Sequence, residues 1–341
     1  MTLQYQLPPD LLEATRLTRA GRLLEATAIL QRVLQRQAGP QAAANDPVPG
    51  RVIDAEFSQV VERGSFISGS YGNHAGTRPY KLYIPGSHAG KALPMIVMLH
   101  GCTQTPDDFA AGTRMNELAE ERACFVLYPA QTRAANRSRC WNWFKRGDQR
   151  RDQGEPAIIA GMTREVQKRH GIDARKVYVA GLSAGGAMAA VVGEAYPDLY
   201  AAIGIHSGLA VGSAHDVPSA FAAMRGMRSP LPSGSSRAVP IIVFHGDQDT
   251  TVHPRNGEHV ASVTASSKTV SVDRGQVPGG HAYTRTVHCD AAGRVAVEHW
   301  LVHGAGHAWS GGSPRGSYTD PKGPDAAREM RRFFDQVSAG D

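Results

Sequence analysis

The strongest constraint on the fold is the stretch around Ser183, where a buried strand must turn sharply into a helix. Residues 177–180 are small, β-branched or aromatic, the sequence G-L-S-A-G follows at 181–185, and an alanine-rich segment with helical character comes next. A G-x-S-x-G turn in this context holds its serine at the tip, with the hydroxyl at the positive end of the helix. The glycines are needed because the two backbones approach too closely for a Cβ atom. We therefore interpret Ser183 as a nucleophile.

The chain around this turn alternates short apolar strands with helices. We expect strands at residues 78–84, 95–99, 124–128, 177–180, 200–205, 241–244 and 295–302, and helices at 107–122, 157–169 and 325–337. Repeated βα units with short apolar strands predict an α/β fold, in which a mostly parallel sheet is covered by helices on both faces. We expect strand 295–302 to close the sheet. Active groups in such sheets lie in loops at the carboxyl ends of the strands.

The serine needs an acid and a base at those strand ends. A serine hydroxyl is a weak nucleophile until a base takes its proton, and an acid must orient that base. Asp247 and Asp249 both follow strand 241–244. We favour Asp249 because it ends the G-x-x-D turn that begins at Gly246. Hydrolases whose serine lies in a G-x-S-x-G turn usually carry the acid in such a turn. We interpret Asp247 as a turn residue that bonds its own backbone.

His307 is the predicted base. It lies in the loop H-G-A-G-H that follows strand 295–302, and the glycines give it freedom to swing toward the serine. His303 competes for the role, but at the strand end it would point into or beside the sheet. Of the 14 histidines, only His307 combines the chain order Ser, Asp, His with a loop position and flanking glycines.

Two backbone N–H groups should form an oxyanion hole for the developing negative charge. One is predicted to come from Ala184, directly after the nucleophile. The other should come from the loop H-G-C-T-Q at residues 100–104, with Cys102 or its neighbour as donor. We interpret His206, at the end of strand 200–205, as a residue behind the site.

Composition excludes several other classes of protein. The 341 residues are 41% hydrophobic and 20% charged, as in ordinary globular proteins. The net charge of +6 comes without any nucleic-acid-binding motif. No apolar run reaches the roughly 18 residues of a membrane span. Four cysteines lack a C-x-x-C pattern, so we expect no metal ion and no cofactor. An ester substrate is the predicted partner, with neither nucleic acid nor membrane.

The first fifty residues differ from the rest. We expect an N-terminal helical appendage at residues 1–37, a linker rich in Ala, Pro and Gly at 38–50, and a catalytic domain at 51–341. We expect the appendage to pack on the domain or to mediate homo-oligomerisation. The first thirty residues lack the continuous apolar core of a secretory signal, which favours a cytoplasmic location.

Several stretches, in order, resemble the polyhydroxybutyrate (PHB) depolymerase family of esterases, which is related to feruloyl and acetylxylan esterases. They lie at residues 100–104, 139–144, 181–186, 245–250, 303–312, 316–321 and 323–325. The resemblance implies an α/β-hydrolase fold and a serine esterase without a metal, with Ser183, Asp249 and His307 as its triad. It also suggests that Trp141, Trp143 and Trp309 line the acyl pocket. A disulfide between Cys102 and Cys140 would loosely resemble the family and would argue for an extracellular or periplasmic location.

The resemblance has two departures that bear on the substrate. Family members that attack solid polymer usually carry a secretion signal and a separate substrate-binding domain, and this sequence displays neither. We therefore expect 3-hydroxybutyrate oligomers, amorphous polyester or small acyl esters as substrates. A feruloyl or acetylxylan esterase is the alternative enzyme. The alternative of another class is a binding or scaffold protein that has lost activity.

Overall fold

The computed structural model describes residue 13 and residues 64–227, 239–263 and 268–338. The predicted N-terminal helical appendage and linker therefore lie outside the described residues, except for Glu13. The predicted homo-oligomerisation through the appendage concerns the same residues. Within the described residues, no helix is long and apolar enough to cross a membrane.

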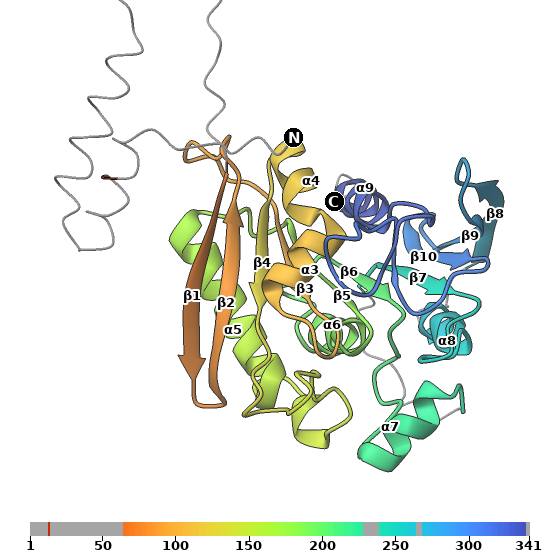
Figure 1. The fold of residues 1–341 in the computed structure, drawn as a ribbon, viewed down its shortest axis with the longest axis horizontal. Helices are drawn as coiled ribbons and strands as arrows, with labels where there is room; N and C mark the ends of the chain where they lie inside the picture. The colour runs from red at the N-terminus through yellow and green to blue at the C-terminus, as the bar shows by residue number, and fades with distance from the viewer. Residues whose placement is uncertain (1–12, 14–63, 228–238, 264–267, 339–341) are drawn as a thin grey trace, which may run out of the picture. The chain divides into compact units, whose positions relative to one another are not determined.

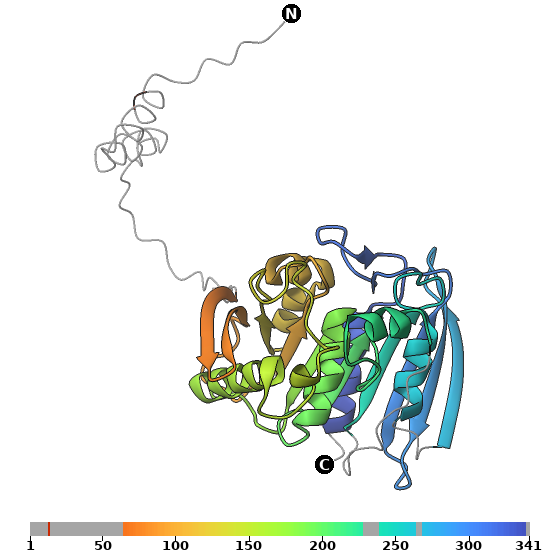
Figure 2. The same ribbon diagram turned by 90° about the horizontal axis from the view of Figure 1, so that it is seen from below.

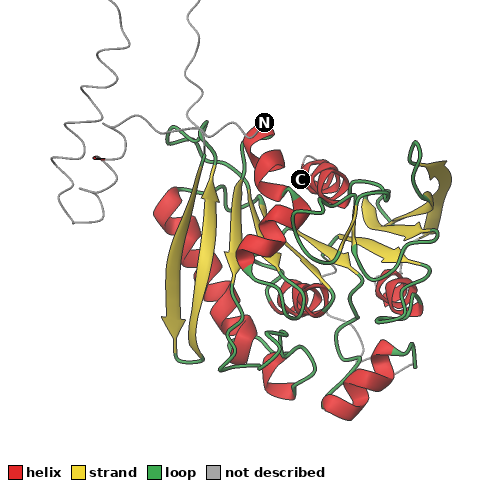
Figure 3. Cartoon of the chain, viewed as in Figure 1, coloured by secondary structure: helices red, strands yellow, loops and turns green. Residues whose placement is uncertain are grey.

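A ten-stranded sheet forms the centre of the domain (Figure 3). Its strand order is β1-β2-β4-β3-β5-β6-β7-β10-β9-β8. The bounds are β1 Ser65–Asn73, β2 Gly76–Ile84, β3 Met95–Leu99, β4 Phe125–Pro129, β5 Val177–Leu182, β6 Ala202–His206, β7 Ile241–Gly246, β8 Lys268–Gln276, β9 Ala282–Cys289 and β10 Val295–Val302. All pairs from β4 through β10 are parallel. Strands β3 to β6 are buried along their whole length, which explains their continuous apolar sequences.

The two edges of the sheet differ from the prediction. Strand β10 does not close the sheet, because β9 and β8 continue it in antiparallel fashion. At the other edge, β1 pairs with β2 in an antiparallel hairpin. Figure 2 shows these two additions at opposite ends of the sheet. Strands β1 and β9 are only partly buried and rich in polar residues, so their sequences lack the apolar runs that identified the central strands.

Helices cover both faces of the sheet, as predicted. The helices are α3 Pro106–Thr113, α4 Met115–Glu121, α5 Gly154–His170, α6 Ala184–Ala195, α7 Val217–Met224, α8 Arg255–Val263 and α9 Ala326–Ser338. Along β3, Val97 packs into one apolar cluster with α5 and α6, whereas Ile96 and Met98 pack into a second with α3, α4 and α9. In Figure 1, α4 and α9 lie above the strands, and α6 and α8 lie below them. Successive side chains along a strand point to opposite faces of the sheet and thus contribute to two separate hydrophobic cores.

The single helix predicted at 107–122 is in fact two short helices. Arg114 separates α3 from α4 in a left-handed conformation, with φ of 55°. Its guanidinium donates to the carbonyl of Gly311 and pairs with Asp325 at 3.0 Å. The break therefore ties these helices to the C-terminal segment, which follows the predicted histidine loop. This segment carries the two-residue strands β11 Trp309–Ser310 and β12 Thr319–Asp320.

Candidate active site

Ser183 lies at a strained turn between β5 and α6. Its backbone has φ of 57° and ψ of −119°, a conformation that residues with a side chain rarely adopt. A Cβ on Gly185 would lie 2.0 Å from the carbonyl oxygen of Leu99, and one on Gly181 would lie 2.4 Å from the backbone of Gly185. Only glycine fits both places. The turn leaves Ser183 partly exposed while the residues on either side are buried.

Asp249 is buried in the turn after β7, with 3% of its surface exposed. Its Oδ1 accepts from the amides of Thr251 and Val252 at 2.9 and 2.8 Å, and its Oδ2 lies 2.7 Å from His307 Nδ1. Burial alone would raise the pKa of Asp249, but hydrogen bonds from His245, His307 and the Val252 amide hold it well below its usual range. The carboxylate is therefore ionised and fully engaged.

His307 follows β10 and is largely buried, with 12% of its side chain exposed. Because its Nδ1 donates to Asp249, the imidazole presents a bare Nε2 that can accept a proton. Strands β5, β6, β7 and β10 are parallel neighbours, so the loops carrying Ser183, Asp249 and His307 share one edge of the sheet. No hydrogen bond between Ser183 Oγ and His307 is formed among the described residues. Without a bound substrate, such bonds are often long.

A second aspartate–histidine pair lies at the same strand ends. Asp247 Oδ2 is 2.9 Å from His303 Nδ1, and Asp247 Oδ1 accepts from the Gly304 amide at 2.7 Å. His303 Nε2 lies 2.9 Å from the hydroxyl of Thr284 on β9. The competitor histidine of the sequence is thus paired with the competitor aspartate. This pair fastens the beginning of the loop that leads to His307.

The two predicted oxyanion donors are close to the serine and unused. A Cβ placed on Gly101, next to Cys102, would lie 3.7 Å from Ser183 Cβ. The amides of Cys102 and Ala184 donate to no acceptor among the described residues. Ala184 opens α6, whose N-terminus adds positive potential at this point. These N–H groups can stabilise a negatively charged oxygen beside Ser183.

His100 orients the peptide that carries the Cys102 N–H. Its Nδ1 lies 2.8 Å from the Gly101 carbonyl, and its Nε2 accepts from the Gln131 amide at 3.1 Å. Burial lowers the pKa of His100 to about 4, so the ring is neutral with its proton on Nδ1. In a planar trans peptide the carbonyl and the N–H point in opposite directions. Fixing the Gly101 carbonyl therefore directs the Cys102 N–H away from His100.

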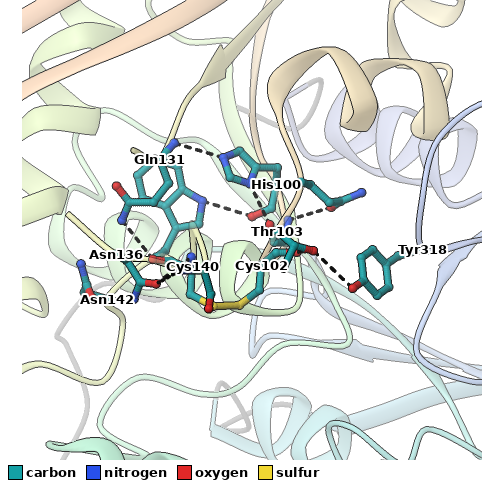
Figure 4. The surroundings of a disulfide bond; sticks show 12 residues. His100, Cys102, Thr103, Gln131, Asn136, Cys140, Asn142 and Tyr318 are labelled. Carbon is teal, nitrogen blue, oxygen red and sulfur yellow. Dashed lines mark hydrogen bonds between the residues drawn. A yellow bond between two sulfur atoms is a disulfide. The ribbon is translucent and has the colours of Figure 1, made fainter. Parts of the chain in front are cut away.

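A disulfide joins Cys102 to Cys140, a pairing that the sequence had left open. Next to the disulfide, the Thr103 amide donates to the Ser138 carbonyl at 2.6 Å, and the Arg139 guanidinium donates to the Thr103 carbonyl. Figure 4 shows the disulfide between residues 100–104, named here the oxyanion loop because it carries the predicted donor Cys102, and the loop that carries Asn136 and Asn142. These contacts fasten the oxyanion loop to residues 136–142.

The three predicted pocket tryptophans are core residues instead. Trp141, Trp143 and Trp309 are 0%, 6% and 1% exposed. The Trp141 indole donates to the His100 carbonyl at 3.1 Å, and Trp309 stacks on His206. Side chains with so little accessible surface offer almost no contact area to a ligand, so this burial is at odds with their prediction as pocket lining. Trp141 thereby supports the loop that carries Cys102, and Trp309 supports the end of β6, both from behind.

His206 lies behind the serine, where its sequence position suggested. Its carbonyl accepts from the Ser183 amide at 2.8 Å, and its Nε2 accepts from the Ser310 amide at 2.9 Å. Burial lowers its pKa to about 3, so the ring is neutral.

Sequence reasoning missed His245 as a partner of the acid. This fully buried ring donates from Nε2 to the Val252 carbonyl at 2.7 Å and lies 3.4 Å from Asp249 Oδ2. Its place at the end of β7, four residues before Asp249, was the available signal. Among the described residues, no group of three or more histidine, cysteine or acidic side chains could hold a metal ion.

Known proteins similar to this chain include a depolymerase and several esterases. Poly(3-hydroxyalkanoate) depolymerase C of Paucimonas lemoignei is 31% identical over 252 residues, which cover 70% of this chain and 60% of that protein. Feruloyl esterase B of Neurospora crassa is 28% identical over 273 residues, which cover 74% of this chain and 88% of that protein. The chain thus spans less than two thirds of the depolymerase.

The solved structure of an acetyl xylan esterase from Aspergillus awamori matches with a TM-score of 0.59 at 22% identity, covering 67% of this chain and 89% of that one. This likeness confirms the predicted α/β-hydrolase fold. A sequence profile of the family described as Esterase PHB depolymerase matches residues 78–277, more than half of the chain. This protein therefore belongs to the esterase PHB depolymerase family.

Proposed function

We propose that the protein is a serine esterase that hydrolyses carboxylic esters through an acyl-enzyme on Ser183. The observation that carries this proposal is the 2.7 Å bond between Asp249 and His307, at the sheet edge where a strained turn presents Ser183. The free amides of Cys102 and Ala184 give further support, because an acyl-transfer site needs donors for an oxyanion. A binding protein has no need of this arrangement.

The reaction proceeds in two steps of acyl transfer. Ser183 Oγ attacks the ester carbonyl carbon while His307 Nε2 takes the hydroxyl proton, and Asp249 stabilises the imidazolium. The amides of Cys102 and Ala184 hold the oxyanion of the tetrahedral intermediate. The intermediate collapses when the alcohol leaves with the proton from His307. Water then attacks the acyl-serine, gives a proton to His307 and releases the acid, and Ser183 regains its hydrogen.

Hydroxyalkanoate oligomers are the substrates we propose first. Poly(3-hydroxyalkanoate) depolymerase C is the relative with the higher identity of the two described, at 31%. Feruloyl or acetyl esters of carbohydrate are the second candidate, favoured by the 88% of feruloyl esterase B that the chain spans. The disulfide further supports work in an oxidising compartment rather than in the cytoplasm.

Replacing the nucleophile tests the proposal. We expect Ser183→Ala to lower kcat for p-nitrophenyl butyrate by on the order of 10⁴-fold, with an unchanged circular dichroism spectrum. Turnover near that of the wild type would contradict the assignment of Ser183. Comparing 3-hydroxybutyrate oligomers with methyl ferulate and acetylated xylan then decides between the two substrate classes.

A further inference from the structure

Tyr318 has an unusual conformation beside the active site. It is 47% exposed and has φ of 54°, a left-handed conformation that a tyrosine adopts only when its surroundings impose it. Its carbonyl accepts from the amide of Trp309, two residues after His307, at 2.7 Å. The backbone of Tyr318 is therefore fixed to the histidine loop.

The other end of Tyr318 reaches the oxyanion loop. Its hydroxyl lies 3.3 Å from Thr103 Oγ1, which itself donates to the Cys102 carbonyl at 2.6 Å. Because the Thr103 hydrogen is used in that bond, the Tyr318 hydroxyl is the donor to Thr103. Figure 4 shows the ring reaching toward Thr103 and Cys102. The side chain thus bridges the two loops that carry the proposed base and the proposed oxyanion donor.

Neighbouring contacts hold this bridge in place. The Ser317 amide and hydroxyl donate to Asp108 at 2.9 and 2.6 Å, and Gln104 donates to the Ser317 carbonyl at 3.0 Å. The same Gln104 accepts from the Gly101 amide at 2.9 Å. The ring is therefore presented at a fixed place. Because the hydroxyl hydrogen is used in the bond to Thr103, the exposed part of the ring offers a ligand mainly an uncharged aromatic surface.

We propose that the Tyr318 ring forms the wall of a substrate subsite beside the oxyanion loop. This subsite binds the repeating unit next to the scissile bond in an oligomeric hydroxyalkanoate ester. Such a unit exposes methyl and methylene groups, which pack favourably on an aromatic face. The inference rests on the proposed function. It assigns to Tyr318 the selection of substrates longer than one unit.

Two substrates and three variants test the subsite. The substrates are methyl 3-hydroxybutyrate, which has one unit, and the linear 3-hydroxybutyrate trimer. Tyr318→Gly removes the ring at no backbone cost, since glycine adopts positive φ readily. Tyr318→Phe keeps the ring and removes the hydroxyl. Ile67→Ala, on the edge strand β1 and 42% exposed, is the matched loss of an exposed apolar side chain.

We expect Tyr318→Gly to lower kcat/KM for the trimer by about tenfold or more, mainly by raising KM. The same variant should lower kcat/KM for the one-unit ester by less than about threefold. Ile67→Ala should match the wild type on both substrates, whereas Tyr318→Phe, which keeps the ring but loses its bond to Thr103, should lose less on the trimer than Tyr318→Gly does. Equal losses on both substrates would overturn the subsite and make Tyr318 a brace for the oxyanion loop. An unchanged trimer value in Tyr318→Gly would overturn it as well.

A failure of the proposed function gives a different result. A wild-type enzyme that hydrolyses neither hydroxybutyrate ester contradicts the proposed substrate class and the subsite together. A wild-type enzyme that hydrolyses both, with no selective loss in Tyr318→Gly, contradicts the subsite alone.

Discussion

Two aspartate–histidine pairs lie side by side where β7 and β10 end, and their chemistry is nearly the same. In both, a carboxylate oxygen is within 2.9 Å of an imidazole Nδ1. The Asp247–His303 pair even has a hydroxyl, that of Thr284, on the far nitrogen of its histidine. Considered as three residues, Thr284, His303 and Asp247 form a complete hydroxyl–histidine–acid relay.

Their surroundings separate the two pairs. Asp249 and His307 have 0% and 12% of their side chains exposed, against 28% and 39% for Asp247 and His303. Thr284 lies within strand β9, whereas Ser183 stands at a strained turn before a helix, beside unused amide donors. A hydroxyl, a histidine and an acid therefore do not suffice for ester hydrolysis. An esterase site also needs an exposed nucleophile and donors for the oxyanion.

Removing one carboxylate at a time gives the largest expected difference between the pairs. We expect Asp249→Asn to lower kcat for p-nitrophenyl butyrate by about 10³- to 10⁴-fold, because the amide no longer holds the imidazole in its working tautomer. Asp247→Asn should cost less than about tenfold, since Asp247 touches no reacting atom. Steady-state kinetics at pH 8 measures both, and a larger loss in Asp247→Asn would reverse the assignment.

The two aspartate variants cannot be compared at acid pH, because the free energy of unfolding falls there. Burial lowers the pKa of His100 to about 4 and that of His206 to about 3, against about 6.5 in the unfolded chain. Below pH 6.5 the unfolded state therefore binds more protons, and stability falls as the pH falls toward 4. Two such groups give a slope of up to about 3 kcal/mol per pH unit.

Urea unfolding at pH 7, 6 and 5 measures that slope. His100→Gln should flatten it in part, since one of the buried imidazoles with a lowered pKa is then gone. A free energy of unfolding that stays constant between pH 7 and 5 would show that these rings are protonated as readily in the fold as outside it.

Removing the disulfide tests the oxyanion donors, which lie beside Ser183 and have no counterpart among the described residues at the Asp247–His303 pair. Cys102→Ala with Cys140→Ala should reduce kcat by about 10- to 100-fold, because the Cys102 amide loses its fixed position. The cross-link spans 38 residues, so its loss should also lower stability by about 3–4 kcal/mol. Cys289→Ala, which removes a partly exposed free thiol, is the control. Full activity in the double variant would mean that the hydrogen bonds of Thr103 suffice to hold the loop.

The smallest expected effect concerns the hydroxyl of the second pair. Thr284→Val keeps the shape of the side chain and removes its bond to His303, which should cost about 1 kcal/mol of stability and leave kcat unchanged. Thermal unfolding and p-nitrophenyl butyrate assays give the two values. A clear loss of kcat would make Thr284 part of the reaction.

The central fold was predictable because its information is local in the sequence. Strands such as β3 and β5 are fully buried, so their sequences are unbroken apolar runs. The turn at Ser183 requires glycines at fixed spacing, and the conformation of Ser183 explains that pattern. Strands β1 and β9 are only partly buried and carry many polar residues, and these strands and β8 were missed.

The pairing of Asp249 with His307 was predictable because it depends on chain order, whereas features that depend on burial were not. Asp249 and His307 follow strand ends in hydrolase order, which a sequence displays. Whether a tryptophan faces a pocket or the core depends on contacts between distant segments, and Trp141 proved to be fully buried. Pairing of Asp247 with His303 likewise arises from two turns 56 residues apart.

Labelling with a fluorophosphonate probe tests the central claim most directly. The probe reacts with a serine only when a base and an oxyanion hole activate that serine. We predict one adduct, located by peptide mass spectrometry on Ser183, which forms far more slowly in Asp249→Asn than in Asp247→Asn. An adduct on Thr284, or none on Ser183, would contradict the account.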